Sequence, residues 1–144
     1  MREYMNKEAL RQNLIREEGL ELHLYKCPAD HWTIGVGRNL QSRGISETTA
    51  MQMLDEDIDL CIDEMKVGIK HFDAYPEPIK EALVDLCFNM GISRLLQFKK
   101  TLGYLEEGLT TGNYTKAAVE LMNSNYAKQL PARAKRNHDR IFNA

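Results

Sequence analysis

Hydrophobic positions recur along most of the chain at the three- and four-residue steps of an amphipathic helix. The longest such stretch runs from Glu47 to about Lys70, and Ser46 before it is a good N-cap. At ~1.5 Å per residue this helix spans more than about 30 Å, enough to connect two lobes. Its apolar face comprises Ala50, Leu54, Ile58, Cys61, Ile62, Met65 and Ile69. We therefore expect a long connecting helix, with Cys61 in the core.

The same spacing predicts helices on both sides of this one. Asn6 to Glu18 forms a modest amphipathic helix that Gly19 ends. The segment 73–78 contains two prolines, which cannot continue a helix, so we expect it to end the long helix before the next one begins. The expected later helices are one over 79–90 that ends at Gly91, one capped by Ser93 that stops near Gly108, one from Tyr114, and a basic one that begins at Pro131.

Between the first two helices the period changes from about four residues to two. Leu20, Leu22 and Leu24 alternate with polar neighbours, and a second run from Trp32 to Gly37 follows the turn 27–31. In that second run Thr33 falls on the face opposite the apolar residues. The pattern predicts a β-hairpin with one apolar face, followed by a polar loop over 39–44.

These elements predict an α+β fold that is predominantly α-helical. The 144 residues, 43% of them hydrophobic, suffice for one domain with a real core. We expect residues 1–46 to form the first helix and a small N-terminal β-hairpin lobe, 47–70 the connecting helix, and 71–144 a helical C-terminal lobe.

Composition and motifs exclude several classes of function. A net charge of −2 argues against non-specific nucleic-acid binding, and no apolar run is long enough for membrane insertion. The first residues lack a signal-peptide core, so we expect the protein to begin in the cytosol. Three separated cysteines and four scattered histidines favour reduced thiols, no metal site and no cofactor, and no P-loop, dinucleotide-binding or Gly-x-Ser-x-Gly motif is present.

The candidate chemistry lies around the hairpin. Glu18 at a helix end, facing apolar side chains, would lose solvent, and desolvation raises the pKa of a carboxyl group toward that of a general acid. Cleavage of a glycosidic bond also needs a group that activates water or attacks the sugar. Thr33 is a candidate to hold water, and Cys27 a candidate base, nucleophile or lining group. The alternative is a solvated glutamate with a structural cysteine and threonine.

The order of these residues resembles the signature of the phage-type lysozymes, which are muramidases. Their pattern is a catalytic Glu, eight residues, an Asp or sometimes a Cys, five residues and a Thr, and Glu18, Cys27 and Thr33 fit it. Similar motifs follow at 82–91, 117–119 and 131–136. The resemblance implies a lysozyme-like fold. Asp30 is an alternative carboxylate, but the spacing favours Cys27.

The resemblance also implies roles for single residues. Glu18 is the expected proton donor, and Arg133 the expected residue that orients this acid. The expected sugar contacts are Asn39 on the hairpin side and Phe88, Asn89 and Thr101 in the helical lobe. Glu120 stands at the position of a cleft asparagine of the family. With a thiol in place of the second carboxylate, we expect Cys27 and Thr33 to position water, so that hydrolysis inverts the sugar.

The resulting hypothesis is a phage endolysin that hydrolyses the β-1,4 bond between N-acetylmuramic acid and N-acetylglucosamine in peptidoglycan. It implies a monomer that accumulates in the host cytoplasm and reaches the periplasmic cell wall through a holin pore. Two alternatives stay open: a lytic transglycosylase that uses Glu18 alone, and a catalytically inactive wall-binding module. Transglycosylation would leave 1,6-anhydro-muramic ends, whereas hydrolysis leaves reducing ends.

Overall fold

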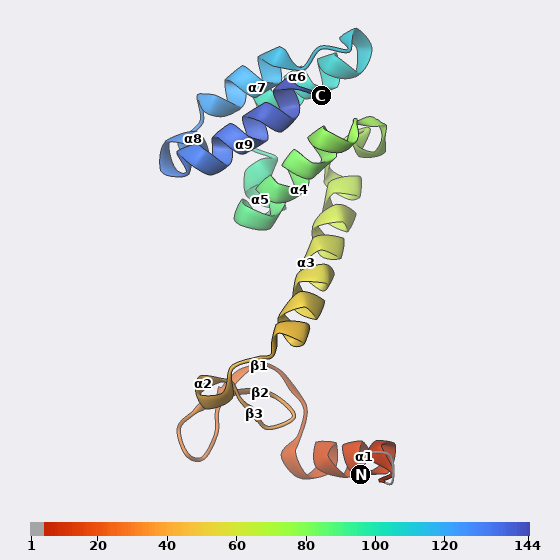
Figure 1. Ribbon diagram of the computed structural model, residues 1–144, viewed down its shortest axis with the longest axis vertical. Helices are drawn as coiled ribbons and strands as arrows, with labels where there is room; N and C mark the ends of the chain where they lie inside the picture. Colours follow the sequence, from red (N-terminus) through yellow and green to blue (C-terminus); the bar gives the residue numbers. More distant parts are fainter. Residues whose placement is uncertain (1–4) are drawn as a thin grey trace. The chain divides into compact units, whose positions relative to one another are not determined.

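The computed structural model describes residues 5–144, which divide into two compact units. The first extends to Met51 and the second begins at Gln52. The fold is mainly helical with a small antiparallel sheet, which confirms the predicted α+β class (Figure 1). No helix in the described residues is long and apolar enough to cross a membrane.

The first unit begins with the predicted helix α1, Lys7–Glu18. Asn6 caps it, because its side-chain oxygen accepts a hydrogen bond from the backbone N–H of Ala9 at 3.0 Å. Three antiparallel strands follow in the order β1-β2-β3: β1 Glu21–Lys26, β2 Trp32–Gly35 and β3 Arg38–Asn39. The short helix α2, Leu40–Arg43, closes the sheet region.

Two expectations for this unit are wrong. The segment 39–44 is not a loop throughout, because Asn39 pairs with Thr33 in the sheet and then caps α2. The face assignment of the hairpin is also reversed at β2. Thr33 is 2% exposed and Trp32 46% exposed, since the Thr33 hydroxyl donates to the backbone carbonyl of His31 and is satisfied inside.

Helix α3, Glu47–Gly68, begins in the first unit and continues in the second (Figure 1). Ser46 caps it as predicted, with its hydroxyl accepting from the Thr49 N–H at 3.1 Å. The second unit continues with the 3-10 turn η2 Phe72–Ala74 and the helices α4 Glu77–Met90, α5 Ile92–Leu95, α6 Lys99–Thr111, α7 Thr115–Met122, α8 Asn125–Gln129 and α9 Pro131–Phe142.

Some helix boundaries differ from the prediction. Ser93 lies inside α5 rather than at an N-cap, and α6 begins separately after Phe98. Helix α6 runs to Thr111, three residues past Gly108, and ends at Gly112 in the left-handed region. The one-turn α8 was not predicted, although Ser124 caps it through the Ala127 N–H.

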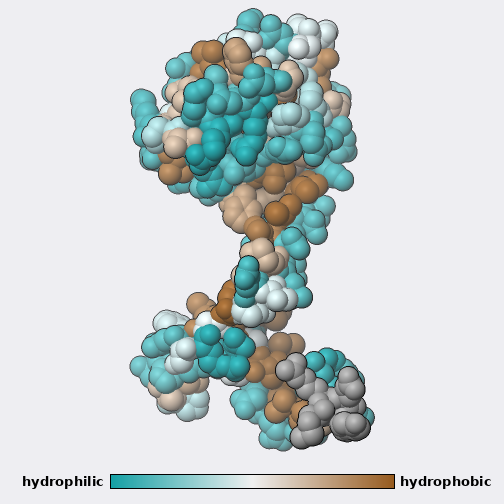
Figure 2. All heavy atoms as spheres, viewed as in Figure 1, coloured by the Kyte–Doolittle hydropathy of each residue, from teal (hydrophilic) through white to brown (hydrophobic). Residues whose placement is uncertain are grey.

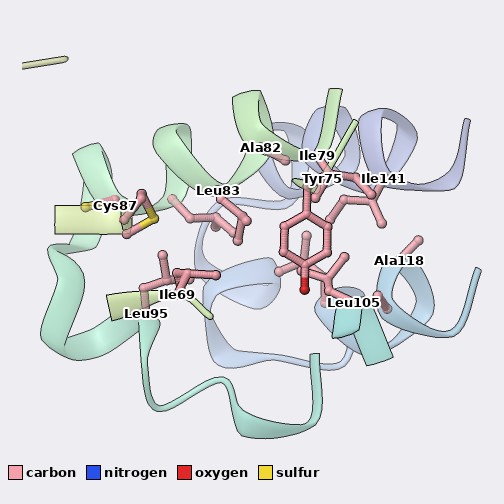
Figure 3. Packing of buried hydrophobic residues seen from close by; sticks show 14 of the residues in the cluster. Ile69, Tyr75, Ile79, Ala82, Leu83, Cys87, Leu95, Leu105, Ala118 and Ile141 are labelled. Atoms are coloured by element: carbon pink, nitrogen blue, oxygen red, sulfur yellow. The ribbon is translucent and has the colours of Figure 1, made fainter. Parts of the chain in front are cut away.

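The hydrophobic core lies in the second unit. Leu83 of α4, Leu105 of α6 and Ile141 of α9 are at most 1% exposed and pack in one cluster (Figure 3). Cys61 belongs to this cluster, which confirms its predicted place. On the face drawn in Figure 2, most of the surface from α4 onward is hydrophilic, and hydrophobic residues show along α3. The core therefore fixes the helices that carry the candidate residues of this unit.

Candidate active site

Glu18 lies at the last position of α1, directly against the backbone of Gly37. A Cβ atom added at Gly37 would stand 2.7 Å from Glu18 Oε2, and Gly37 has a φ of +64°, so a side chain there would shift the Glu18 carboxylate and strain the backbone. Together they line a hollow of about 430 Å³ with Leu14, Ile15 and Val36. The sheet region thus holds the predicted acid beside an apolar wall.

In the turn between β1 and β2, the side chains of Cys27 and Thr33 both form hydrogen bonds with the backbone of His31. The backbone N–H of His31 donates to Cys27 Sγ at 3.4 Å, and Thr33 Oγ1 donates to the His31 carbonyl at 2.8 Å. Donation from His31 holds the pKa of the partly exposed Cys27 thiol below its usual value, against the opposing effect of burial. The Thr33 hydroxyl keeps its lone pairs free to accept.

Asn39 joins the same cluster from the third strand. Its register partner is Thr33, and its amide nitrogen lies 3.0 Å from His31 Nδ1. The side chain of Asp30, the alternative carboxylate, is 87% exposed and pairs with Lys26 at 3.8 Å. The structure therefore brings Cys27, Thr33 and Asn39 together around His31, a residue that the sequence did not single out.

The predicted sugar contacts of the second unit fall into two hollows. Asn89 and Thr101 line one of about 630 Å³, together with Glu120 and Tyr126. Phe88 and Arg133 line another of about 670 Å³. Phe88 is 44% exposed and Thr101 only 5%, so their side chains meet solvent to very different extents.

Arg133 forms a two-pronged ion pair with Asp85 of α4. Its Nε and Nη2 donate to the two carboxylate oxygens at 3.0 and 2.9 Å. Asn137, which is fully buried, donates to Asp85 at 2.7 Å and to the Tyr126 hydroxyl at 3.1 Å. Burial alone would raise the pKa of Asp85, but the hydrogen bonds from Arg133 and Asn137 outweigh it and hold that pKa below its usual value.

Sequence reasoning missed Asp85 and Asn137, yet the sequence carried a signal for both. Asn137 interrupts the apolar stripe of α9 at the helical spacing between Ala134 and Ile141. Asp85 sits beside the buried Leu86 and Cys87 in α4. A polar residue next to buried apolar ones predicts a satisfied polar network, and the hydrogen bonds form one.

The side chains that could take part in chemistry are carboxylates and thiols. Among residues 5–144 no cluster of His, Cys, Asp or Glu has the geometry to hold a metal ion. The two core thiols are not candidate nucleophiles, because Cys61 is buried and burial raises the pKa of Cys87 to about 12. Cys27 is the thiol whose setting favours the ionised form.

Comparisons with known proteins agree with the signature. The family described as Phage lysozyme matches residues 15–139. The chain is 26% identical to "Probable T4-type lysozyme 2" of Dictyostelium discoideum, over 89% of this chain and 90% of that protein. It is 32% identical to "Endolysin" of Acyrthosiphon pisum secondary endosymbiont phage 1, over 78% of this chain and 75% of that protein. The chain therefore belongs to the phage lysozyme family.

Proposed function

We propose that this chain is an endolysin that hydrolyses the β-1,4 bond between N-acetylmuramic acid and N-acetylglucosamine in peptidoglycan, with Glu18 as the proton donor. The observation that carries the proposal is the position of Glu18 at the end of α1 against Gly37. Membership of the phage lysozyme family and the endolysin name of a relative support the same reaction.

In the proposed reaction the Glu18 proton passes to the leaving glycosidic oxygen. A water oxygen forms the new bond to the anomeric carbon as the glycosidic bond breaks, and its proton passes to the Cys27 sulfur or to solvent. Thr33 Oγ1 already donates to His31, so it accepts a hydrogen bond from that water. Attack by water on the face opposite the leaving group inverts the sugar.

The remaining roles follow the family pattern. Arg133 is proposed to orient the acid, and Asn39, Phe88, Asn89 and Thr101 to contact the sugars. The exposed aromatic ring of Phe88 and the pairing of Asn39 within the His31 cluster support these roles. We further propose a monomer that leaves the host cytoplasm through a holin pore and acts on the wall in the periplasm. Light scattering tests the monomer, and lysis of a Gram-negative host only when a holin is co-expressed tests the route.

The decisive experiment compares Glu18→Gln with Glu17→Gln, its neighbour in α1. Wild type and Glu17→Gln are expected to clear a peptidoglycan suspension at similar rates. Glu18→Gln is expected to lose about 10²-fold or more, the range for removal of a general acid. Equal clearing by the two variants would refute Glu18 as the acid.

Analysis of the products separates the competing reactions. Hydrolysis yields reducing muramic ends that borohydride converts to muramitol, whereas 1,6-anhydro ends would indicate a lytic transglycosylase. Mass spectrometry of enzyme trapped during turnover tests the role of the thiol, because a glycosyl adduct on Cys27 would contradict attack by water. A wild-type protein that binds wall without releasing any fragment would be an inactive binding module.

A further inference from the structure

The side-chain amide of Asn39 has one orientation that its partners allow. Its oxygen caps α2, because Oδ1 accepts a hydrogen bond from the backbone N–H of Ser42 at 3.0 Å. A backbone N–H only donates, so the atom that faces Ser42 is the amide oxygen. The amide nitrogen of Asn39 is therefore the atom that lies 3.0 Å from Nδ1 of His31.

This orientation determines where the His31 ring carries its proton. The amide nitrogen of Asn39 has two N–H donors and does not accept, so Nδ1 of His31 is the acceptor of their hydrogen bond. An accepting Nδ1 carries no proton, and a neutral imidazole then has its proton on Nε2. The contact between β3 and the β1–β2 turn thus requires a neutral ring in this one tautomer.

The ring of His31 is open to protonation from solvent. His31 is partly exposed, and its Nε2 has no hydrogen-bond partner among residues 5–144. No side-chain nitrogen or oxygen of those residues is both buried and unpartnered, so Nε2 reaches the surface. Histidine side chains generally change charge between about pH 5 and 8. A proton on Nδ1 would oppose the Asn39 N–H groups and break the hydrogen bond.

No other charged group competes with Asn39 for this ring. The ionisable groups of the turn and of the elements packed on it are Glu21, His23, Tyr25, Lys26, Cys27, Asp30, Arg38 and Arg43. Lys26 pairs with Asp30 at 3.8 Å, and Arg38 donates to the Gly44 carbonyl at 2.8 and 3.1 Å. In the part of the chain that the structure describes, none of the eight forms a side-chain hydrogen bond or ion pair with the His31 ring.

The two bonds leave Asn39 with groups that are free for a ligand. An amide has two N–H donors and an oxygen with two lone pairs, and His31 and Ser42 use one of each. The same bonds keep the amide from rotating, so the remaining donor and acceptor have fixed directions. Asn39 is partly exposed and pairs with Thr33 in the sheet. A ligand at this edge of the sheet therefore meets a preorganised amide.

We propose that His31 is a positioning residue: its neutral ring holds the Asn39 amide in the orientation that binds the sugar, and protonation of the ring releases that amide. The proposal rests on the proposed function, in which Asn39 contacts the glycan. A released amide must be ordered again when the sugar binds, and this ordering costs affinity. Acidification should therefore weaken glycan binding through His31.

NMR of the isotope-labelled full chain tests the hydrogen bond independently of activity. At about pH 8 a long-range proton–nitrogen spectrum should show Nδ1 of His31 unprotonated and the proton on Nε2. During acidification the side-chain amide signals of Asn39 should shift with the same midpoint as the His31 ring signals. A proton on Nδ1 at the higher pH, or Asn39 signals that do not follow the titration of His31, would overturn the proposal.

Two substitutions of His31 test the effect on binding. Both keep its backbone, and thus the bonds to Cys27 and Thr33. His31→Asn can place an amide oxygen where Nδ1 stands, so it accepts from Asn39 at any pH, whereas His31→Phe has no acceptor. The probe is an alternating N-acetylglucosamine–N-acetylmuramic acid tetrasaccharide, and each chain also carries Glu18→Gln to prevent turnover.

The expected result is a pH-dependent affinity that His31→Asn abolishes. With His31 present, the Kd for the tetrasaccharide should rise about three- to tenfold between about pH 8 and about pH 5, the range for loss of one neutral hydrogen bond. His31→Asn should keep the tighter Kd at both pH values, and His31→Phe should show the weaker one at both. The same pH dependence in His31→Asn, or no binding at either pH, would refute the positioning role.

The matched control is His23→Gln. His23 is exposed on β1 and forms no side-chain hydrogen bond or ion pair within the described range, so its substitution should leave the pH dependence as it is with His31 present. Thermal melts check that every variant is folded. Clearing of peptidoglycan by the wild-type chain is measured separately. A chain that passes the NMR and binding tests but clears no peptidoglycan would refute the proposed lysozyme reaction and leave the role of His31 standing.

Discussion

At the scale of single residues, the turn at His31 determines what Cys27 and Thr33 can do. The His31 N–H donates to the thiol and its carbonyl accepts from the hydroxyl, so one peptide segment fixes both side chains. The thiol is thereby shifted toward its ionised form, and the hydroxyl is left as an acceptor. In the proposed reaction the thiol is a weak base and the hydroxyl binds water, in place of the second acid group of a two-carboxylate enzyme.

Replacement of this thiol by a carboxylate should move the pH range of activity. The ordinary pKa of Asp is near ~3.9 and that of Cys near ~8.5. A base must be deprotonated, so Cys27→Asp is expected to be active at lower pH than wild type, by more than about one pH unit, in a turbidity assay. Cys27→Ser cannot ionise in this range, so its activity should no longer vary with pH through titration of residue 27. An unchanged profile in Cys27→Asp would show that residue 27 is not the base.

Asp85 should contribute to stability in a pH-dependent way. Its pKa is lower in the folded protein than in the unfolded chain, so its contribution is present above about pH 4 and is lost as the pH falls through the folded value. Asp85→Asn should lower the free energy of unfolding by about 1–3 kcal/mol at pH 7, and by less at pH 3. Urea titrations at both pH values measure this difference.

Asp63→Asn is the control for that experiment. Asp63 is exposed on α3 and forms no hydrogen bond or ion pair with the described residues. Its substitution should leave the free energy of unfolding nearly unchanged at either pH. A loss in Asp85→Asn that was the same at pH 3 and pH 7 would mean that the ion pair with Arg133 is not its source.

Residue spacing predicted which residues of the β1–β2 turn lie close together, but it missed the network around Asp85. The signature singled out Glu18, Cys27 and Thr33 as candidates, because it depends only on positions along one short segment. Asp85 lies 48 residues from Arg133 in the chain, and their pairing depends on the packing of α4 against α9. One sequence gives no direct sign of such a long-range pair, so the network around Asn137 emerged only from the fold.

At the scale of elements, long amphipathic helices were predictable and short polar ones were not. Helix α3 has an apolar face over six turns and a capping serine, and both signals agree. Helices α2 and α8 have four and five residues, too few for a periodic pattern. The faces of the hairpin were misjudged because alternation alone does not reveal that a hydroxyl finds its partner inside.

The junction of α1 with the sheet region gives a test at this scale. Gly37→Ala places a methyl group 2.7 Å from Glu18 Oε2 and must displace that carboxylate. Because small misplacements of catalytic groups are costly, activity should fall at least about tenfold. Gly44→Ala is the control, since Gly44 has a similar positive φ of +59° but open space around its Cβ position. Peptidoglycan clearing by Gly44→Ala should stay near wild type, and a comparable loss in both variants would assign the effect to backbone strain.

At the scale of the whole molecule, the two units differ in how much they bury. Twenty buried hydrophobic residues form the core cluster, and every one belongs to the second unit. In the described part of the first unit, Thr33 is the only buried residue. Apolar burial is the main favourable term in folding. The helices from α4 onward should therefore unfold together, in the most stable cooperative unit of the chain.

Hydrogen exchange of the intact chain tests this distribution. Backbone amides of α4, α6 and α9 should exchange only through global unfolding, whereas those of β1 and β2 should exchange through local openings of lower free energy. Exchange rates followed with increasing urea distinguish the two, because only global opening depends steeply on denaturant. Equal protection across both units would contradict the proposed asymmetry.

The confinement of the core to one unit has a practical consequence for selecting improved variants. A melting temperature will report mainly on the helical unit, so damage at Cys27, Thr33 or Gly37 will pass a thermal screen unnoticed. Conversely, gains in heat resistance obtained by refilling the core will leave the acid and its turn untouched. Libraries of this protein therefore need two independent selections, one for thermal stability and one for the clearing of peptidoglycan.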